Sequence, residues 1–244
     1  MSLVRSALFS LFYPRTCAMC GRYLGDERDS TPKLCLCEEC MHRLPRTEQA
    51  AIRENETEMA LWGKVHSRAA ARRVMHLDRA AAFLFFEKDH PVQDMIHRMK
   101  YADQPMIGYQ LGREAAMEFQ CADFFDEIDV IVPIPLHPKR LRERGYNQSE
   151  YIARGISDVT GIPVDTTHVE RIRNTPKQAL QSGDERKQNV ADAFAVNHPE
   201  QLYHKHILLV DDLITTGETA RSCLRAMRLF RGATVSVFAL CKAR

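Results

Sequence analysis

The sequence predicts an α/β fold, in which a doubly wound, mostly parallel sheet carries a small cysteine-rich module at its N-terminal end. Three observations lead to this prediction. Apolar runs of strand length alternate with helical patterns from residue 79 onward. One of these runs, 207–210, leads into an acidic turn rich in Thr and Gly, and two CxxC pairs stand near the N-terminus.

The elements follow in order from the hydrophobic patterns. Strands are predicted at 79–87, 128–132, 168–171, 194–196, 207–210 and 234–241, and the last of these closes the sheet. Helices are predicted at 54–61, 91–101, 106–119, 148–159 and 220–230. Strands that alternate with helices are typical of parallel sheets, because each crossover needs a connection long enough for a helix.

The chain of 244 residues is long enough for one substantial core and a small accessory module. We expect an N-terminal helix and metal-binding ribbon in 1–45, a connector in 46–77 and the α/β domain in 78–244. The short apolar stretch near the N-terminus is followed by Tyr13, Pro14 and a cysteine pair instead of a small-residue cleavage site. It is therefore interpreted as a docking helix, not a signal peptide, and the chain is expected to be cytoplasmic.

Composition narrows the functional classes. Hydrophobic residues make up 45% and charged residues 27%, and no apolar run approaches 18 residues, so no membrane span is expected. The net charge of +2 excludes the strong overall positive field of a dedicated nucleic-acid binder. Any argument for nucleic acid must therefore rest on a local patch.

Two CxxC pairs predict a structural zinc site. Cys17 and Cys20 form the first pair, and Cys37 and Cys40 form the second after a gap within the zinc-ribbon range. Each pair presents two thiolates on one side of a tight turn, so four sulfurs complete a tetrahedral Zn²⁺ site. The segment between the pairs has too little apolar surface for its own core, so the metal would supply its folding energy.

The other cysteines leave one alternative open. Cys35 could replace Cys37 as a ligand, although the CxxC spacing favours Cys37. A disulfide is disfavoured in a cytosolic chain, and a redox CxxC would need a thioredoxin-like context that this segment lacks. The scattered cysteines are expected to act as small core hydrophobes: Cys121, Cys223 and Cys241.

The run 207–219 predicts a sugar-phosphate site. Asp211 and Asp212 follow a buried strand at its carboxyl end, where open α/β sheets bind ligands, and can accept hydrogen bonds from vicinal ribose hydroxyls. The next turn offers hydroxyls and backbone N–H groups to a phosphate at a helix N-terminus, and Gly217 allows close approach. This turn consists of Thr215, Thr216, Gly217, Glu218 and Thr219. The alternative is a helix-capping turn, which needs only one acid.

Two loops add to the predicted site. The loop 133–148 follows the strand 128–132 and carries clustered cations that suit a pyrophosphate; a solvated charged turn is the alternative. These cations are Lys139, Arg140, Arg142 and Arg144. The long polar loop 171–190 is expected to cover the bound ligand, with an ordinary surface loop as the alternative.

The run 207–219 is similar to the signature of type I phosphoribosyltransferases, which bind phosphoribosyl pyrophosphate (PRPP). That resemblance implies that Asp211 and Asp212 hold the ribose hydroxyls in the catalytic site and that the following turn holds the 5'-phosphate. Nearly the whole chain resembles the ComF family of competence-associated, amidophosphoribosyltransferase-like proteins. The matching motifs are the CxxC pairs, MetLysTyr at 99–101, ValProIlePro at 132–135, ArgGlyTyrAsnGln at 144–148, and Arg173, Gln178, Arg186 and Asn189.

The resemblance implies a zinc-ribbon head on a type I phosphoribosyltransferase domain, and a role in DNA uptake. Two functions stay open. In the first, the chain transfers phosphoribosyl groups from PRPP with Mg²⁺, and needs no protein nucleophile. In the second, PRPP or a nucleotide is a regulatory ligand, and the zinc ribbon contacts single-stranded DNA or a competence helicase. The acceptor substrate and the oligomeric state do not follow from the sequence.

Overall fold

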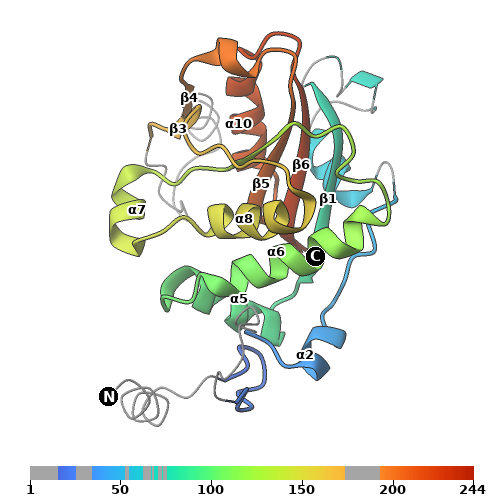
Figure 1. Cartoon of the computed structure of the whole chain (residues 1–244), viewed down its shortest axis with the longest axis vertical. Helices are drawn as coiled ribbons and strands as arrows, with labels where there is room; N and C mark the ends of the chain where they lie inside the picture. The colour runs from blue at the N-terminus through green and yellow to red at the C-terminus, as the bar shows by residue number, and fades with distance from the viewer. Residues whose placement is uncertain are drawn as a thin grey trace.

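The computed structural model of the chain describes residues 16–25, 35–52, 55–62, 67, 69–70, 73, 76–173 and 193–244. Its centre is a four-stranded parallel sheet of order β1-β6-β5-β2 (Figure 1). The strands are β1 (Leu77–Phe86), β2 (Val130–Pro133), β5 (His206–Ile214) and β6 (Thr234–Ala243). A parallel bridge between Ile131 and Val164 continues the sheet beyond β2. The predicted α/β class is confirmed.

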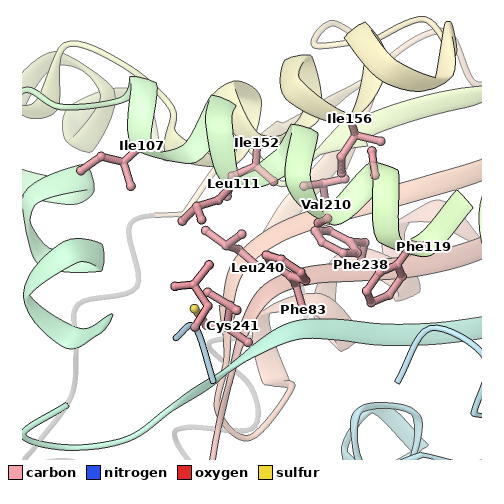
Figure 2. Packing of buried hydrophobic residues seen from close by; sticks show 14 of the residues in the cluster. Phe83, Ile107, Leu111, Phe119, Ile152, Ile156, Val210, Phe238, Leu240 and Cys241 are labelled. Carbon is pink, nitrogen blue, oxygen red and sulfur yellow. The ribbon is translucent and has the colours of Figure 1, made fainter. Parts of the chain in front are cut away.

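Helices cover both faces of this sheet. The elements on one face are α5 (Pro91–Tyr101), α6 (Met106–Gln120) and α8 (Gln148–Thr160), and those on the other are α3 (Glu56–Trp62) and α10 (Glu218–Met227). Phe119 of α6 packs edge-on against Phe238 of β6, with ring centroids 5.5 Å apart, in the core between α6, α8 and the sheet (Figure 2). The sheet is therefore buried on both sides, as continuous apolar strands require.

Two glycines let α6 and α8 pack with their backbones in contact. A Cβ atom on Gly112 would lie 2.4 Å from the carbonyl oxygen of Ile152, and one on Gly155 would lie 2.0 Å from that of Tyr109. Neither space can hold a side chain. This close pair forms one wall of the core, and α8 begins after Asn147, whose side chain accepts from the N–H of Ser149.

The strand at the C-terminal end of the sequence lies in the interior of the sheet. β6 pairs with β1 on one side and with β5 on the other, so β1 is the edge strand on this side. The two short strands β3 (Val169–Arg171) and β4 (Phe194–Val196) pair antiparallel in a separate sheet. Most of the loop 171–190, which is predicted to cover the ligand, lies outside the described residues, because 174–192 are not among them.

The basic segment 133–148 was predicted to be a loop, and this is wrong in part, because it contains the helix α7 (Pro138–Arg144). His137 caps the helix by accepting a hydrogen bond from the N–H of Lys139 at 3.2 Å, and Pro138 occupies the first turn. Gly145 ends the helix in the left-handed conformation, with φ of 83°. Proline at the start and glycine after the end are ordinary helix boundaries, which the density of charges obscured in the sequence.

The cysteine-rich segment lies at one end of the molecule beside α5 (Figure 1). Its short helix α2 (Glu38–His42) begins directly after Cys37. Cys17, Cys37 and Cys40 are buried in the same apolar cluster as Met95 and Met99 of α5. The N-terminal docking helix predicted from the sequence falls in residues 1–15, outside the described part of the chain.

Candidate functional site

The acidic pair lies inside β5, not just after it. β5 continues to Ile214 because its partner β6 is long, and Asp211 pairs in register with Ala239. On the other side the ladder with β2 ends earlier, at Pro133 opposite Val210. The predicted strand end at Val210 is therefore wrong by four residues. The pair still lies beyond the carboxyl end of β2, where a ligand in an open α/β sheet has access.

The two carboxyl groups extend toward opposite faces of the sheet. Side chains alternate along a strand, and Leu208 and Val210 belong to the core under α6 and α8, whereas Ile207 and Leu209 belong to the core under α10. Asp212 continues the first set and Asp211 the second. A ligand that contacts both acids must therefore bind across the edge of the sheet.

Lys100 forms an ion pair with the acidic pair from the last turn of α5. Its Nζ atom lies 2.8 Å from Oδ1 of Asp212, and the side chains are only 17% and 7% exposed. Asp211 lies next to this contact, and its Oδ1 accepts the N–H of Asp212 at 2.8 Å. Burial is the largest cause that raises the pKa of Asp211 to about 7, and repulsion from Asp212 is the second. The charges of Lys100 and Arg171 act against this rise. Burial and mutual repulsion thus disfavour the doubly ionised form of the pair.

Arg171 connects the acidic pair to the basic helix. It ends β3, and its guanidinium group lies 5.4 Å from the ring centroid of Phe194. Burial and the neighbouring charge of Arg140 lower the pKa of Arg171, and the charge of Asp211 opposes the change. Arg140 of α7 and Asp211 of β5 therefore both lie within electrostatic range of Arg171 of β3.

The turn after β5 forms the N-terminus of α10. Thr215 and Thr216 are exposed, and Gly217 is the N-cap residue with φ of 73°. Because Gly217 has no side chain to cap the helix, the first N–H groups of α10 can serve an anion. A Cβ atom on Gly217 would lie 3.0 Å from the carbonyl oxygen of Ala60. The close approach that this glycine permits is therefore to α3, in the segment predicted to be a connector.

Glu218 has partners within α10. Its carboxylate accepts hydrogen bonds from Arg221 at 2.7 Å and from Arg225 at 3.3 Å. Burial acts to raise the pKa of Glu218, but these two arginines lower it below its usual value. Arg221 also donates to the carbonyl oxygen of Ala60 at 2.5 Å, so the turn is braced against α3. Thr219, the next residue, is half-buried at the start of the helix.

The end of α7 meets the end of α5. The guanidinium group of Arg144 lies 4.9 Å from the ring centroid of Tyr101 and donates a hydrogen bond to Gln148. The hydroxyl of Tyr146 donates to the carbonyl oxygen of Met99 at 2.7 Å. The basic segment is therefore joined to the helix that carries Lys100. Farther along α7, Lys139 is exposed and Arg140 is half-buried.

Sequence reasoning missed two residues of this arrangement, Lys100 and Arg171. Arg171 was considered only as the boundary of a loop. A signal for Lys100 was present in the MetLysTyr motif at 99–101, which was treated only as a mark of resemblance. In the structure each of its three residues has a different contact: Met99 accepts from Tyr146, Lys100 pairs with Asp212, and Tyr101 lies under Arg144.

The four predicted cysteine ligands come together. One ligand atom from each of Cys17, Cys20, Cys37 and Cys40 lies within 4.8 Å of the others, and the Sγ atoms of Cys20 and Cys37 are 3.7 Å apart. A tetrahedral site with Zn–S bonds of about 2.3 Å needs sulfurs about 3.8 Å apart, so this donor set fits zinc. Cys35 is not one of the four, and its N–H donates to Gln110 of α6.

Backbone N–H groups support this cluster. The N–H of Cys37 donates to Sγ of Cys17 at 3.4 Å, and the N–H of Gly21 donates to the carbonyl oxygen of Cys17 at 2.9 Å. Burial acts to raise the pKa of Cys17, but hydrogen bonds from neighbouring groups outweigh it and lower this pKa to about 6. Cys17 is therefore favoured as a thiolate, which is the form that binds a metal, whereas burial raises the pKa of Cys40. Cys223 and Cys241 are fully buried core residues as predicted, whereas Cys121 is exposed and that prediction is wrong.

No protein-family model matches the chain. Competence protein F of Haemophilus influenzae is 31% identical over 158 residues, which are 63% of this chain and 69% of that protein. DNA utilization protein YhgH of Escherichia coli strain K12 is 31% identical over 155 residues, 62% of this chain and 67% of that protein. Among solved structures, the glutamine PRPP amidotransferase of B. subtilis is 21% identical with a TM-score of 0.37; the match covers 57% of this chain and 30% of that one.

The chain therefore combines a parallel α/β sheet, which has an acidic pair and a Thr/Gly turn on one strand, with four cysteines spaced as in a metal site. The chain belongs to the ComF family, together with competence protein F and YhgH. In the described residues, no helix has the length and apolar character needed to cross a membrane.

Proposed function

We propose that the chain binds PRPP, or a related ribose phosphate, at the carboxyl edge of its sheet and transfers or senses phosphoribosyl groups there. The observation that supports this most strongly is the acidic pair beyond the end of β2, with the uncapped N-terminus of α10 after it and cations of α5, α7 and β3 around it. Carboxylates suit the ribose hydroxyls, and N–H groups and cations suit phosphates.

In this proposal each element has one task. Asp211 and Asp212 accept hydrogen bonds from the 2' and 3' hydroxyls, and residues 215–219 hold the 5'-phosphate at the start of α10. Lys139, Arg140 and Arg144 hold the pyrophosphate and stabilise its charge as it leaves. Mg²⁺, when bound with the ligand, would neutralise the phosphate charge. Transfer then needs positioning and charge stabilisation, and no protein nucleophile.

The cysteine cluster is proposed to hold one structural Zn²⁺ through Cys17, Cys20, Cys37 and Cys40. The support is the sulfur spacing and the short segment between the two CxxC pairs, which has few apolar residues of its own. On this basis we divide the chain into an N-terminal ribbon, 1–45, a connector, 46–77, and the phosphoribosyltransferase-like domain, 78–244. We also propose that the protein works in the cytoplasm, where four reduced cysteines persist.

A second candidate function is suggested by the names of the relatives, DNA utilization protein and competence protein F. In it the sugar-phosphate site is regulatory, and the ribbon contacts single-stranded DNA or a helicase involved in DNA uptake. The two functions differ in one measurable product. PRPP-dependent release of pyrophosphate, screened against nucleobases, amines and single-stranded DNA, is expected only of the transferase.

Ligand binding itself is tested by thermal melting. PRPP with Mg²⁺ is expected to raise the melting temperature, because a ligand that binds only the folded state stabilises it by mass action. The double change Asp211→Asn and Asp212→Asn should remove most of this rise. Asp129→Asn is a matched control, because Asp129 precedes β2 away from the acidic pair and accepts from His206. Equal shifts in the wild type and the double variant would show that the pair does not hold the ribose.

A further inference from the structure

The ion pair between Lys100 and Asp212 differs in burial from another lysine pair of the chain. Lys242 lies 2.7 Å from Glu56, but the side chain of Glu56 is 59% exposed, so water shares its charge. Lys100 and Asp212 are both largely removed from water. Removing two charges from water costs several kcal/mol per ion, roughly, and their attraction repays this only with good geometry. A buried pair beside a ligand site therefore calls for a functional explanation.

The position of Lys100 is fixed by its helix. Met95 and Met99 are fully buried on α5, and the carbonyl oxygen of Met99 accepts the Tyr146 hydroxyl at 2.7 Å. The last turn of α5 is therefore anchored to the core and to the basic segment. This anchoring fixes the backbone of Lys100, so its ammonium group stays within reach of Oδ1 of Asp212. If a bound ligand displaced the ammonium group, only the flexible lysine side chain would have to move.

Without Lys100, the buried carboxylate of Asp212, one residue from that of Asp211, would leave an oxygen-donor position for a divalent cation. Mg²⁺ binds such oxygens at about 2.0–2.1 Å in an octahedral arrangement. An ammonium group 2.8 Å from Oδ1 of Asp212 occupies this space and supplies the balancing charge. A sugar hydroxyl does not need the space that the ammonium group occupies. A carboxylate has about four positions that accept a hydrogen bond, so the hydroxyl can donate to one that the lysine leaves open.

We propose that Lys100 is the resident counter-ion of the acidic pair and determines which ligand the pair accepts, a hydroxyl-bearing sugar and not a bare divalent cation. It acts as a positioning and specificity-determining residue. This role rests on the proposed sugar-phosphate function for its ligand, but the exclusion of free metal is a property of the chain alone. Mg²⁺ then enters the site only with the phosphates of the ligand.

The test uses Mn²⁺ alone as the probe, added to the full-length protein purified with its own metal, with free Mn²⁺ measured by electron paramagnetic resonance. Lys100→Met should bind one additional Mn²⁺ at least tenfold more tightly than the wild type does. Adding Asp212→Asn to that variant should abolish the gain, which separates this site from the cysteine cluster. Lys100→Arg keeps the positive charge and should exclude Mn²⁺ as the wild type does.

Lys242→Met is the matched control, because it removes a lysine of similar pairing distance whose partner is exposed. It should leave Mn²⁺ binding unchanged. Folding of each variant is checked by its melting transition, and Lys100→Gln takes the place of Lys100→Met if the latter does not fold. The proposal would be overturned if the folded Lys100→Met or Lys100→Gln variant gained no Mn²⁺ site. It would also be overturned if the wild type bound Mn²⁺ as tightly as that variant.

The same variants separate this proposal from the function on which it rests. Titration with ribose 5-phosphate without metal should be weakened in Lys100→Met, because two carboxylates without a counter-ion repel the phosphate-bearing ligand. If no variant and not even the wild type binds PRPP or ribose 5-phosphate, the sugar-phosphate function fails. The Mn²⁺ titrations would still decide whether Lys100 excludes metal.

Discussion

The cysteine cluster and the acidic pair each gather acidic side chains in a small volume, but the source of the balancing cation differs between them. At the cluster, four sulfurs lie within 4.8 Å of one another on short turns, and the balancing cation must come from solution. At the acidic pair, the carboxylates are on a strand fixed by the core, and the cation is Lys100 of the chain itself. At the acidic pair a lysine on a packed helix supplies the balancing charge, whereas at the cysteine cluster we expect a metal to supply both charge and order.

The helix α5 links the two regions. At its start, His90 and Pro91 line a cavity of about 250 Å³ together with Cys20, Cys40 and Arg43. At its end, Lys100 reaches Asp212. One rigid helix thus lies between the metal-binding head and the acidic pair, so the independence of the two regions is a question for experiment.

The largest effect is expected from the metal ligands. Cys17→Ser and Cys40→Ser should each abolish binding of one Zn²⁺ per chain and unfold the N-terminal ribbon, because the metal supplies the folding energy of so small a module, about 10–16 kcal/mol in zinc-finger peptides. The α/β domain should keep its cooperative melting transition. Metal analysis and limited proteolysis measure the two effects. Zinc retained at full occupancy in both variants would refute the ligand assignment.

A substitution in the core of the α/β domain is expected to lower stability and to leave the metal content of the cysteine cluster unchanged. Phe238→Ala should lower the free energy of unfolding by about 3–5 kcal/mol, because the ring is fully buried and packs edge-on against Phe119. Urea denaturation measures the loss, and the zinc content of the folded protein should not change. Met117→Ala, on an exposed face of α6, is the control and should cost less than about 0.5 kcal/mol. Loss of zinc from a folded Phe238→Ala would show that the regions depend on each other.

The sequence predicted the elements whose signal is local. Pro91 and Tyr101 bound α5 in both the prediction and the structure, because the helix has a proline in its first turn and a continuous apolar stripe. The cysteine ligands were predictable for a similar reason, since the spacing within a CxxC pair is itself the geometry of the knuckle. The structure confirms that the two CxxC pairs lie together.

The remaining features depend on contacts between distant segments. The extent of β5 to Ile214 is set by β6, whose length could not be inferred from the residues of β5. Lys100 lies 112 positions before its partner Asp212, so no local pattern connects them. Gly217 lies close to Ala60 of α3, a contact that no local pattern predicts, and its approach to a ligand stays a prediction. Sequence periodicity describes one element at a time and contains no information about such pairings.

A substitution in the basic helix α7 is expected to have an intermediate effect, on ligand affinity. Arg144→Ala should weaken binding of PRPP by about 1.5–3 kcal/mol and that of ribose 5-phosphate much less, because only PRPP carries the pyrophosphate. Arg142→Ala, exposed on the same helix, is the matched control. Titration with both ligands and with a short single strand of DNA gives the comparison. Equal losses for both sugar phosphates would contradict the pyrophosphate role, and a loss only for DNA, with a smaller salt dependence, would support the nucleic-acid alternative.

The smallest effects are expected from pH. The pKa of Asp211 is raised from 3.8 to about 7, first by burial and then by Asp212. An acid with a raised pKa in the folded state stabilises the fold while it is protonated, so its contribution is complete at low pH and is lost as the pH rises through about 7. In the wild type, Asp211 should therefore contribute to a decline in the free energy of unfolding between pH 4 and 7. This contribution should be absent in Asp211→Asn. An unchanged pH profile in that variant would show that Asp211 titrates near its ordinary value.

Ligand binding should depend on pH in the opposite direction. A ribose hydroxyl donates its strongest hydrogen bonds to an ionised carboxylate, and the ionised fraction of a group with a pKa of about 7 rises about tenfold between pH 6 and pH 8. The affinity for ribose 5-phosphate should therefore increase by up to about tenfold over this interval. The phosphate of the ligand also titrates near pH 6, so the relevant measurement is the difference between the wild type and Asp211→Asn, which share that contribution. Calorimetric titrations at pH 6, 7 and 8 give this difference. Parallel pH profiles would mean that Asp211 does not accept a hydrogen bond from the sugar, and the ribose contact would then rest on Asp212 and its counter-ion Lys100.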